Sequence, residues 1–159
     1  MKKEVIKRVK NVWMLLLAGI LTFGLQSCDD DDNNDNVAPS TELQAAFSAR
    51  FPGVDPNRVE WEWDGRMNAY EADFWENNLE KSAWFSEANE WLMTETDYNY
   101  PYTGVPQAVI DAANASNPDY RLEDIDLIET PDGSYYLVEK ELGERDIYLS
   151  FAADGTPLS

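Results

Sequence analysis

The sequence feature that most constrains the fold is a pattern of one helix followed by short alternating strands, which runs twice along residues 41–159. In the first half, a capping-box spacing at residues 41–44 opens a helical pattern that stops at Pro52-Gly53. In the second half, Val105-Pro106 opens a helical pattern that stops at Asn117-Pro118. The apolar residues of the two patterns recur at the spacing of one helix face: Leu43, Ala46, Phe47 and Phe51, then Val109, Ile110 and Ala113. We therefore predict one helix at the start of each half.

Residues that alternate between apolar and polar follow each predicted helix. Residues 60–63 read Glu-Trp-Glu-Trp, and their counterparts 124–127 read Asp-Ile-Asp-Leu. A period of two residues is typical of a strand with one buried face. Turn signals divide the strands at similar places in both halves: Asp64-Gly65, Asn77-Asn78 and Asn89-Glu90, then Asp132-Gly133, Leu142-Gly143 and Asp154-Gly155. The offset between corresponding features is 64 to 68 residues, which indicates a duplicated unit of one helix plus four antiparallel strands.

This pattern predicts an α+β fold, specifically a two-layer sandwich with the helices on one face of an antiparallel sheet. The helices must cover one face because one face of every predicted strand is apolar. The two units span about residues 41–97 and 105–159, and residues 98–102 link them. The sequence leaves open whether the units share one continuous sheet, although about 120 residues favour a single core.

Several segments of this pattern resemble the PepSY-like, β-lactamase-inhibitor-protein-like domain. They are Phe51-Pro52 and residues 59–62, 70–74, 83–85 and 91–95, then residues 105–109, Tyr120, Asp132-Gly133, Tyr135-Tyr136 and Asp154-Gly155. The resemblance covers about residues 41–159 and implies a duplicated helix-plus-four-strand fold, secretion or lipid anchoring, and no assigned enzymatic activity. It also implies protein binding, since the namesake inhibitor grips an enzyme with one face of its sheet and PepSY domains are linked to protease inhibition. Asn89-Glu90 departs from the Gly-containing turn that is usual in the family, which leaves the last hairpin of the first unit less well defined.

The start of the chain predicts lipid attachment. Five basic residues precede residues 12–25, which carry no charge; this stretch is shorter than the about 20 residues of a membrane span and is typical of a signal peptide. Leu25-Gln26-Ser27-Cys28 resembles the bacterial lipobox, in which the cysteine is joined to diacylglycerol. We therefore predict a signal peptide over residues 1–27 and lipidation of Cys28. This would anchor the protein in the outer membrane of a bacterial cell envelope, facing the periplasm or the exterior.

The alternative is an ordinary secreted protein in which Cys28 is free. Cys28 is the sole cysteine, so no intramolecular disulfide forms in either case. Residues 29–36 are all Asp or Asn and cannot bury apolar area. We interpret residues 28–40 as the lipidated cysteine followed by an acidic disordered tether. An ion site in this segment is the alternative, but the EF-hand positions that require Gly and Glu are Asn34 and Ser40 when counted from Asp29.

The charge balance limits the partners. The chain has 12 basic and 31 acidic residues, and removal of residues 1–27 leaves 7 against 30, a net charge of −23. Nucleic acid is excluded as a partner because phosphate binding requires clustered Lys and Arg. A protein partner met through electrostatics is expected to be basic.

The composition also limits the chemistry. The chain contains no histidine, so Ser-His-Asp, Cys-His and His-based zinc sites are excluded. Paired carboxylates are compatible with glycoside hydrolysis, but no pair is singled out by its surroundings. We therefore expect no catalytic residue, no metal site, no cofactor and no enzymatic activity.

Alternation also predicts which residues lie on the face of the sheet away from the helices, here called the open face. If Trp61, Trp63, Tyr70 and Phe74 face the helices, their neighbours face water. The open face then combines acids with exposed aromatic residues: Glu60, Glu62, Glu71, Asp73, Trp84, Asp124, Asp126, Tyr135, Glu139 and Tyr148. Trp and Tyr are common interface anchors, so this face is the predicted partner-binding site. The alternative is that the acids are ordinary solvated positions and the aromatic residues are simply strand formers.

The leading prediction is a non-catalytic, lipid-anchored envelope protein that binds another protein through this face, such as a protease or other hydrolase that it inhibits. The alternative is a surface lipoprotein that binds a glycan or a small ligand. In that case Trp75, Trp84 or Trp91 would be stacking platforms beside carboxylates.

Overall fold

The computed structural model describes residues 34–158 of the chain. The predicted signal peptide, Cys28 and residues 29–33 lie outside the described residues. No helix within residues 34–158 is both long enough and apolar enough to cross a membrane.

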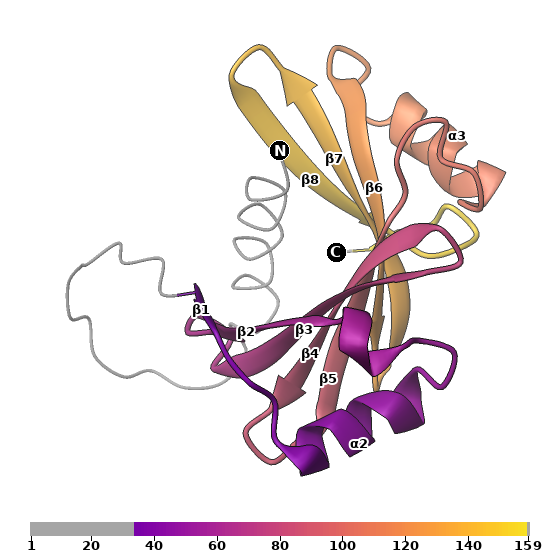
Figure 1. Cartoon of the computed structure of the whole chain (residues 1–159). Coiled ribbons are helices and arrows are strands. Elements are labelled where there is room, and N and C mark those ends of the chain that lie inside the picture. The colour runs from indigo at the N-terminus through magenta and orange to yellow at the C-terminus, as the bar shows by residue number, and fades with distance from the viewer. Residues whose placement is uncertain (1–33, 159) are drawn as a thin grey trace.

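The strands form one antiparallel sheet in which each strand pairs with the next strand of the chain (Figure 1). The elements are β1 (Asn34–Asn36), α2 (Thr41–Arg50), a 3-10 turn (Pro56–Arg58), β2 (Glu60–Asp64), β3 (Ala69–Glu76), β4 (Leu79–Ser86), β5 (Trp91–Asp97), α3 (Gln107–Ala115), β6 (Arg121–Thr130), β7 (Gly133–Leu142), β8 (Arg145–Phe151) and β9 (Pro157–Leu158). The α+β fold with helices beside an antiparallel sheet is therefore confirmed. Since β5 pairs with β6, the two halves share one continuous sheet.

Both helices end where the sequence predicts, but the start of α2 differs by one residue. The side chain of Ser40, not Thr41, accepts a hydrogen bond from the Leu43 N–H at 3.1 Å and caps the helix. At the other end, α2 stops at Arg50, directly before Phe51-Pro52. The last turn of α3 is capped differently, by a lysine from the sheet. Lys140 Nζ donates to the carbonyl oxygens of Ala113, Ser116 and Asn117.

The turn residues singled out in the sequence adopt the conformations that tight turns require. Asn77 and Asn78, between β3 and β4, both have positive φ angles, 54° and 64°. Asn89 also has a positive φ of 63°, so the hairpin between β4 and β5 forms without a glycine. Gly155, with φ +82°, lies against α3: a Cβ atom there would be 2.5 Å from the carbonyl oxygen of Ala108.

The apolar residues on the helix side of the sheet form two clusters, one under each helix. One cluster packs under α2 and consists of Leu43, Phe47, Phe51, Trp61, Ala72, Phe74, Ala83 and Phe85. The other packs under α3 and consists of Tyr102, Val105, Val109, Ala113, Ile125, Tyr136, Val138 and Phe151. Trp61 and Phe74 thus face the helices as predicted, and half-buried Trp63 packs edge-on against Tyr70, with ring centroids 5.0 Å apart. Each helix covers its own half of the sheet, which leaves the centre of the sheet for other contacts.

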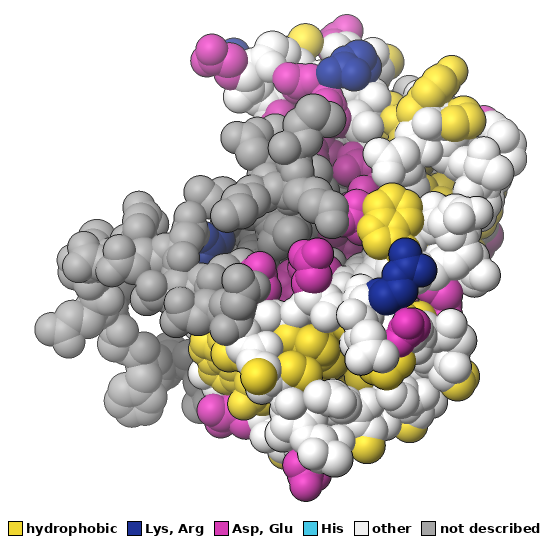
Figure 2. Space-filling model, viewed as in Figure 1, with side chains coloured by type: hydrophobic (Ala, Val, Ile, Leu, Met, Phe, Trp, Pro, Cys, Tyr) yellow, Lys and Arg dark blue, Asp and Glu magenta, His cyan; other side chains and the backbone are white. Residues whose placement is uncertain are grey.

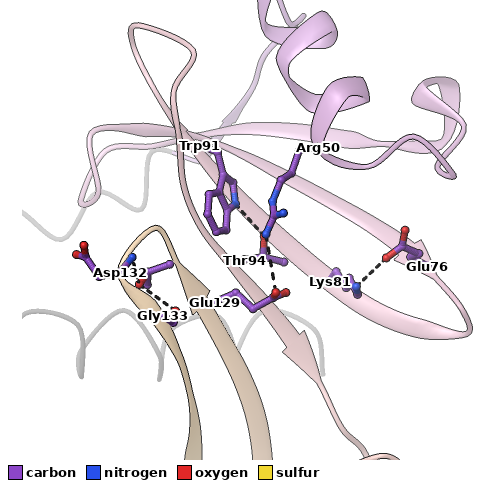
Figure 3. A network of polar contacts seen from close by, with 9 residues as sticks. Arg50, Glu76, Lys81, Trp91, Thr94, Glu129, Asp132 and Gly133 are labelled. Carbon is purple, nitrogen blue, oxygen red and sulfur yellow. Dashed lines mark hydrogen bonds and ion pairs between the residues drawn. The ribbon is translucent and has the colours of Figure 1, made fainter.

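A polar network links α2 to the centre of the sheet (Figure 3). The guanidinium carbon of Arg50 lies 4.0 Å from the ring centroid of Trp91 on β5, within cation–π range. The Nε1 of Trp91 donates to Thr94 Oγ1 at 2.9 Å. Arg50 also forms an ion pair with Glu129 on β6, with an N–O distance of 3.8 Å. Arg50 therefore connects the first helix to strands of both halves.

The last part of the predicted tether contains a short strand. Residues Asn34–Asn36 pair antiparallel with β2, in the register Asn34 to Asp64 and Asn36 to Glu62. This strand forms one edge of the sheet, next to the face described below.

The acidic open face as candidate binding site

The ten residues predicted for the open face lie together on the side of the sheet opposite the helices. Directly paired residues of neighbouring strands share a face, so the register defines rows across the sheet. These rows are Glu60, Asp73, Ser82, Glu95, Ile128 and Tyr135; Glu62, Glu71, Trp84 and Met93; Asp97, Asp126 and Leu137; and Asp124, Glu139 and Tyr148. Strands from both halves of the sheet therefore contribute residues to the open face.

The expectation that all ten residues face water is wrong for four of them. Glu71, Trp84, Asp126 and Glu139 are buried, with exposed fractions of 1%, 4%, 4% and 5%. Glu60 is exposed, and the remaining five are half-buried: Glu62, Asp73, Asp124, Tyr135 and Tyr148.

A third apolar cluster lies on the open face itself and includes the buried Trp84. Its buried members come from both halves of the sheet: Ala69, Trp84, Met93, Ile128 and Leu137. Tyr135 and Tyr148 pack against it, and Trp84 Nε1 donates to Asp64 Oδ2 at 3.3 Å. Trp84 is thus part of an apolar floor and does not project as an exposed anchor. Tyr135 and Tyr148, which are less buried, remain as candidate anchors at one end of this floor.

Two acids of the open face, Glu95 and Asp97 on β5, were missed by the sequence analysis. Asp97 pairs with Asp126, and Glu95 lies two residues before Asp97 and opposite Ile128. Residues 94–97 read Thr-Glu-Thr-Asp, a period-two signal that could have placed both acids on this face. The phase of β5 could not be carried over from β4, because the register shifts between Trp84 and Phe85.

Acids in the middle of the face raise one another's pKa values. Burial, followed by repulsion from Glu71 and Asp124, raises the pKa of Glu95 to about 8. Burial and the charge of Asp97 raise the pKa of Asp124 to about 7. Burial and the charge of Glu95 raise the pKa of Asp126 well above its usual value. Figure 2 shows acidic side chains near the middle of the molecule.

The three tryptophans considered for glycan stacking do not form a common platform. Trp75 is 57% exposed, whereas Trp84 is buried in the apolar floor. The ring of Trp91 lies on the helix side, where the Arg50 guanidinium covers it (Figure 3). The structure thus leaves one accessible ring of the three, which disfavours the glycan alternative.

Comparison with known proteins identifies the family. Residues 68–156 match the family described as "Putative beta-lactamase-inhibitor-like, PepSY-like". A BLIP-like protein from Bacteroides fragilis is 30% identical and has the same fold, with a TM-score of 0.69; the match covers 81% of this chain and 89% of that one. The chain belongs to this PepSY-like family. The resemblance predicted from the sequence is thereby confirmed.

Two further solved structures share this fold. A DUF2874 family protein from Bacteroides uniformis has a TM-score of 0.65 and is 26% identical; the match covers 77% of this chain and 88% of that one. A DUF2874 family protein from Bacteroides ovatus has a TM-score of 0.66 and 20% identity, over 77% and 86%. Among curated proteins, no sequence matches this one.

Proposed function

We propose that this PepSY-like protein is a non-catalytic binding module whose open face holds a basic surface of a partner protein. The observation that carries the proposal is the open face itself. It presents carboxylates beside an apolar floor, with two half-buried tyrosines, Tyr135 and Tyr148, packed against that floor. Aromatic anchors next to a rim of charged groups are typical of protein interfaces. The BLIP-like fold of the relative from Bacteroides fragilis supports the same reading.

The acids determine what kind of partner fits. Carboxylates of Glu60, Glu62 and Asp73 lie on β2 and β3 of this face, and the chain as a whole has a formal charge of −19. Such a surface repels acidic proteins and accelerates encounter with basic ones. Binding should therefore weaken as salt screens the charges. Inhibition of a protease or another hydrolase is the activity we propose for the complex, because the family is named after an enzyme inhibitor.

The proposal is tested by capture from a cell-envelope extract. The tagged full chain, extracted in mild detergent, is compared with a variant of the open face, Glu60→Gln with Asp73→Asn. A matched control removes the same charge from the exposed sides of the helices, Glu42→Gln with Asp111→Asn. We expect a partner that binds the native chain and the control equally, binds the open-face variant several-fold less, and dissociates in high salt. Equal capture by all three chains in low and high salt would contradict the proposed face.

Inhibition is tested separately with the captured partner. The purified partner is assayed with its own substrate in the presence of increasing amounts of the native chain or of the open-face variant. Inhibition by the native chain that is weaker with the variant supports the inhibitor role. Binding without any change in the partner's activity would reject inhibition and leave the binding module in place.

Lipid anchoring at Cys28 is the second part of the proposal. It is supported by the lipobox-like Leu25-Gln26-Ser27-Cys28. A Cys28→Ser chain should leave the membrane fraction, because the residue that carries the lipid is lost. Continued membrane association of this variant would contradict lipid attachment at Cys28.

A further inference from the structure

Three aspartates of the open face converge on one point at the seam between the two halves of the sheet. Asp97 lies on β5, and Asp124 and Asp126 lie on β6. Asp97 and Asp126 are direct cross-strand partners, and one carboxylate oxygen from each of the three residues lies within 4.8 Å of the other two. Two ligands of a single calcium ion, each at about 2.4 Å, are at most about 4.8 Å apart. The three oxygens are therefore close enough to bind the same ion.

Buried carboxylate oxygens without hydrogen bonds occur in the cluster and on its neighbour Glu95. Asp126 is 4% exposed and its Oδ1 has no hydrogen-bond partner, and neither does Oδ1 of Asp97. Glu95, which is 7% exposed, likewise has an Oε2 without a partner. Glu95 precedes Asp97 by two residues on the same face, and its charge is the largest electrostatic influence on the pKa of Asp126. A buried carboxylate oxygen without a partner is costly and calls for a ligand.

The basic side chains of the neighbouring strands have other partners. Lys81 on β4 pairs with Glu76 at 2.7 Å, and Arg121 on β6 pairs with Glu123 and Glu141. Lys140 on β7 binds carbonyl oxygens of the α3 end on the opposite face. These cations are thus not the counter-charges of the three aspartates. Asp126 is buried and Asp97 and Asp124 are half-buried. Like charges this close together and partly removed from water are unfavourable unless protons or a cation balance them.

We propose that Asp97, Asp124 and Asp126, with Glu95 beside them, bind one divalent cation of the calcium class. Calcium fits because it takes six to eight oxygen ligands in irregular geometry and accepts several carboxylates. The sequence pattern alone predicts no metal site here, and the ion site considered as an alternative lies in residues 29–36. The cation would neutralise the centre of the open face and tie β5 to β6. A protein partner is not required for it.

The test is calcium binding by the full chain in mild detergent, after removal of metals with a chelator. Isothermal titration with calcium chloride at about 0.15 M salt, where diffuse attraction to surface charge is screened, should show one ion per chain. We expect a Kd below about 1 mM, the range of extracellular calcium modules. Asp126→Asn should weaken binding at least about tenfold, and Glu42→Gln, at an exposed position of α2, should leave it unchanged.

Thermal unfolding provides a second readout, in which the variant is expected to be more stable than the native chain when calcium is absent. Without calcium, Asp126→Asn should raise the melting temperature, because an amide replaces an ionisable group that is costly to bury beside other acids. With calcium, the melting temperature of the native chain should rise and that of Asp126→Asn should not. A variant that had merely lost its fold would melt lower in both conditions.

Four outcomes would overturn the site. One is the absence of heat and of stabilisation at about 5 mM calcium, above the range of weak extracellular sites. The second is binding of many ions that disappears with salt, which would indicate diffuse attraction only. The third is binding that persists in Asp126→Asn but is lost when residues 29–32 are changed to Asn, which would assign the ion to that segment. The fourth is a melting temperature that rises with a lysine-rich peptide but not with calcium, which would indicate that the aspartates contact a basic partner protein and not a metal ion. Since no partner is present in the calcium titration, its failure leaves the proposed function untouched.

Discussion

Asp97 and Asp126 lie directly opposite each other on β5 and β6, the strand pair that joins the two halves of the sheet. Like charges in this arrangement destabilise a sheet. Residues that attract each other would pair more favourably at these two positions. The two aspartates therefore lower the stability of the fold at the strand pair that joins the halves. We interpret this cost as the consequence of building a cation-attracting surface on the open face.

The burial and the crowding of acids together predict an inverted pH dependence of stability in the absence of divalent cations. The pKa of Glu95 is raised to about 8 and that of Asp124 to about 7, so the folded protein binds more protons than the unfolded chain between these values and the ordinary pKa of about 4. The stabilisation is complete below about pH 4 and is lost as the pH rises through about 7 to 8. Since even one pKa unit corresponds to about 1.4 kcal/mol, unfolding by urea in a chelator should show clearly lower stability at about pH 9 than at about pH 5.

The matched variant for this prediction is Glu95→Gln. The chain has no histidine that would titrate in the same range, so removal of the Glu95 carboxylate should flatten the dependence. Stability that increases from about pH 5 to pH 9, or a slope that Glu95→Gln does not change, would show that these acids do not repel one another as described.

Gly155 should not tolerate a side chain. Its φ is +82°, and a Cβ would lie 2.5 Å from the carbonyl oxygen of Ala108 on α3. Gly155→Ala should therefore lower the free energy of unfolding by about 2–4 kcal/mol, through backbone strain plus displacement of the helix. The control is Gly143→Ala, also at positive φ but with open space around it; its cost should be about 1 kcal/mol. Equal costs in denaturant unfolding would mean that contact with α3 is unimportant.

Lys140 should be a main support of the second helix. It is 1% exposed, and its ammonium caps three carbonyl oxygens at and beyond the end of α3, those of Ala113, Ser116 and Asn117. Lys140→Met fills the same space but removes the lysine donor from all three oxygens, of which only that of Asn117 also accepts a backbone N–H, from Tyr120. We therefore expect a loss of about 2–4 kcal/mol. Lys81→Met, which breaks the partly exposed pair with Glu76, should cost about 1 kcal/mol or less. Faster amide hydrogen exchange in Lys140→Met that is confined to α3 would confirm the loss of the cap as the cause. Unchanged exchange in α3 would contradict it.

Arg50 should contribute through its contact with Trp91. Arg50→Ala removes a guanidinium 4.0 Å from the ring centroid and the ion pair with Glu129, which should cost about 1 kcal/mol. The tryptophan fluorescence should also change, because the ring becomes more exposed. Arg58→Ala, at an exposed position of the 3-10 turn, should alter stability by less than about 0.5 kcal/mol. An effect of Arg50→Ala no larger than that of Arg58→Ala would contradict the contact.

Much of the fold could be predicted from period-two alternation and from turn residues. Glu60–Trp61 and Asp124–Ile125 each reveal the phase of their strand, because one residue is charged and the other is buried against a helix. The continuity of the sheet could not be predicted, since it depends on the pairing of β5 with β6 across a segment that includes α3.

The burial of residues on the open face could not be predicted. Alternation assigns each residue of a strand to one of two faces, but it does not show which residues of other strands pack over it. Trp84 is on the predicted face, yet Met93, Ile128 and Leu137 from other strands enclose it. Glu95 and Asp97 were missed because the register irregularity at Trp84–Phe85 breaks the phase between β4 and β5. Long-range packing, which a single strand does not encode, decides both features.

Site-specific photo-crosslinking in intact cells tests the central claim most directly. A photoreactive residue replaces Tyr148 or Glu60 on the open face, or Glu42 or Asp111 on the helices, in the full chain. The proposed function predicts one crosslinked protein of basic surface charge from both open-face positions and none from the helix positions. Crosslinks to that protein from the helices alone, or none from the open face while the partner still co-purifies, would contradict the assignment of the open face as the binding surface.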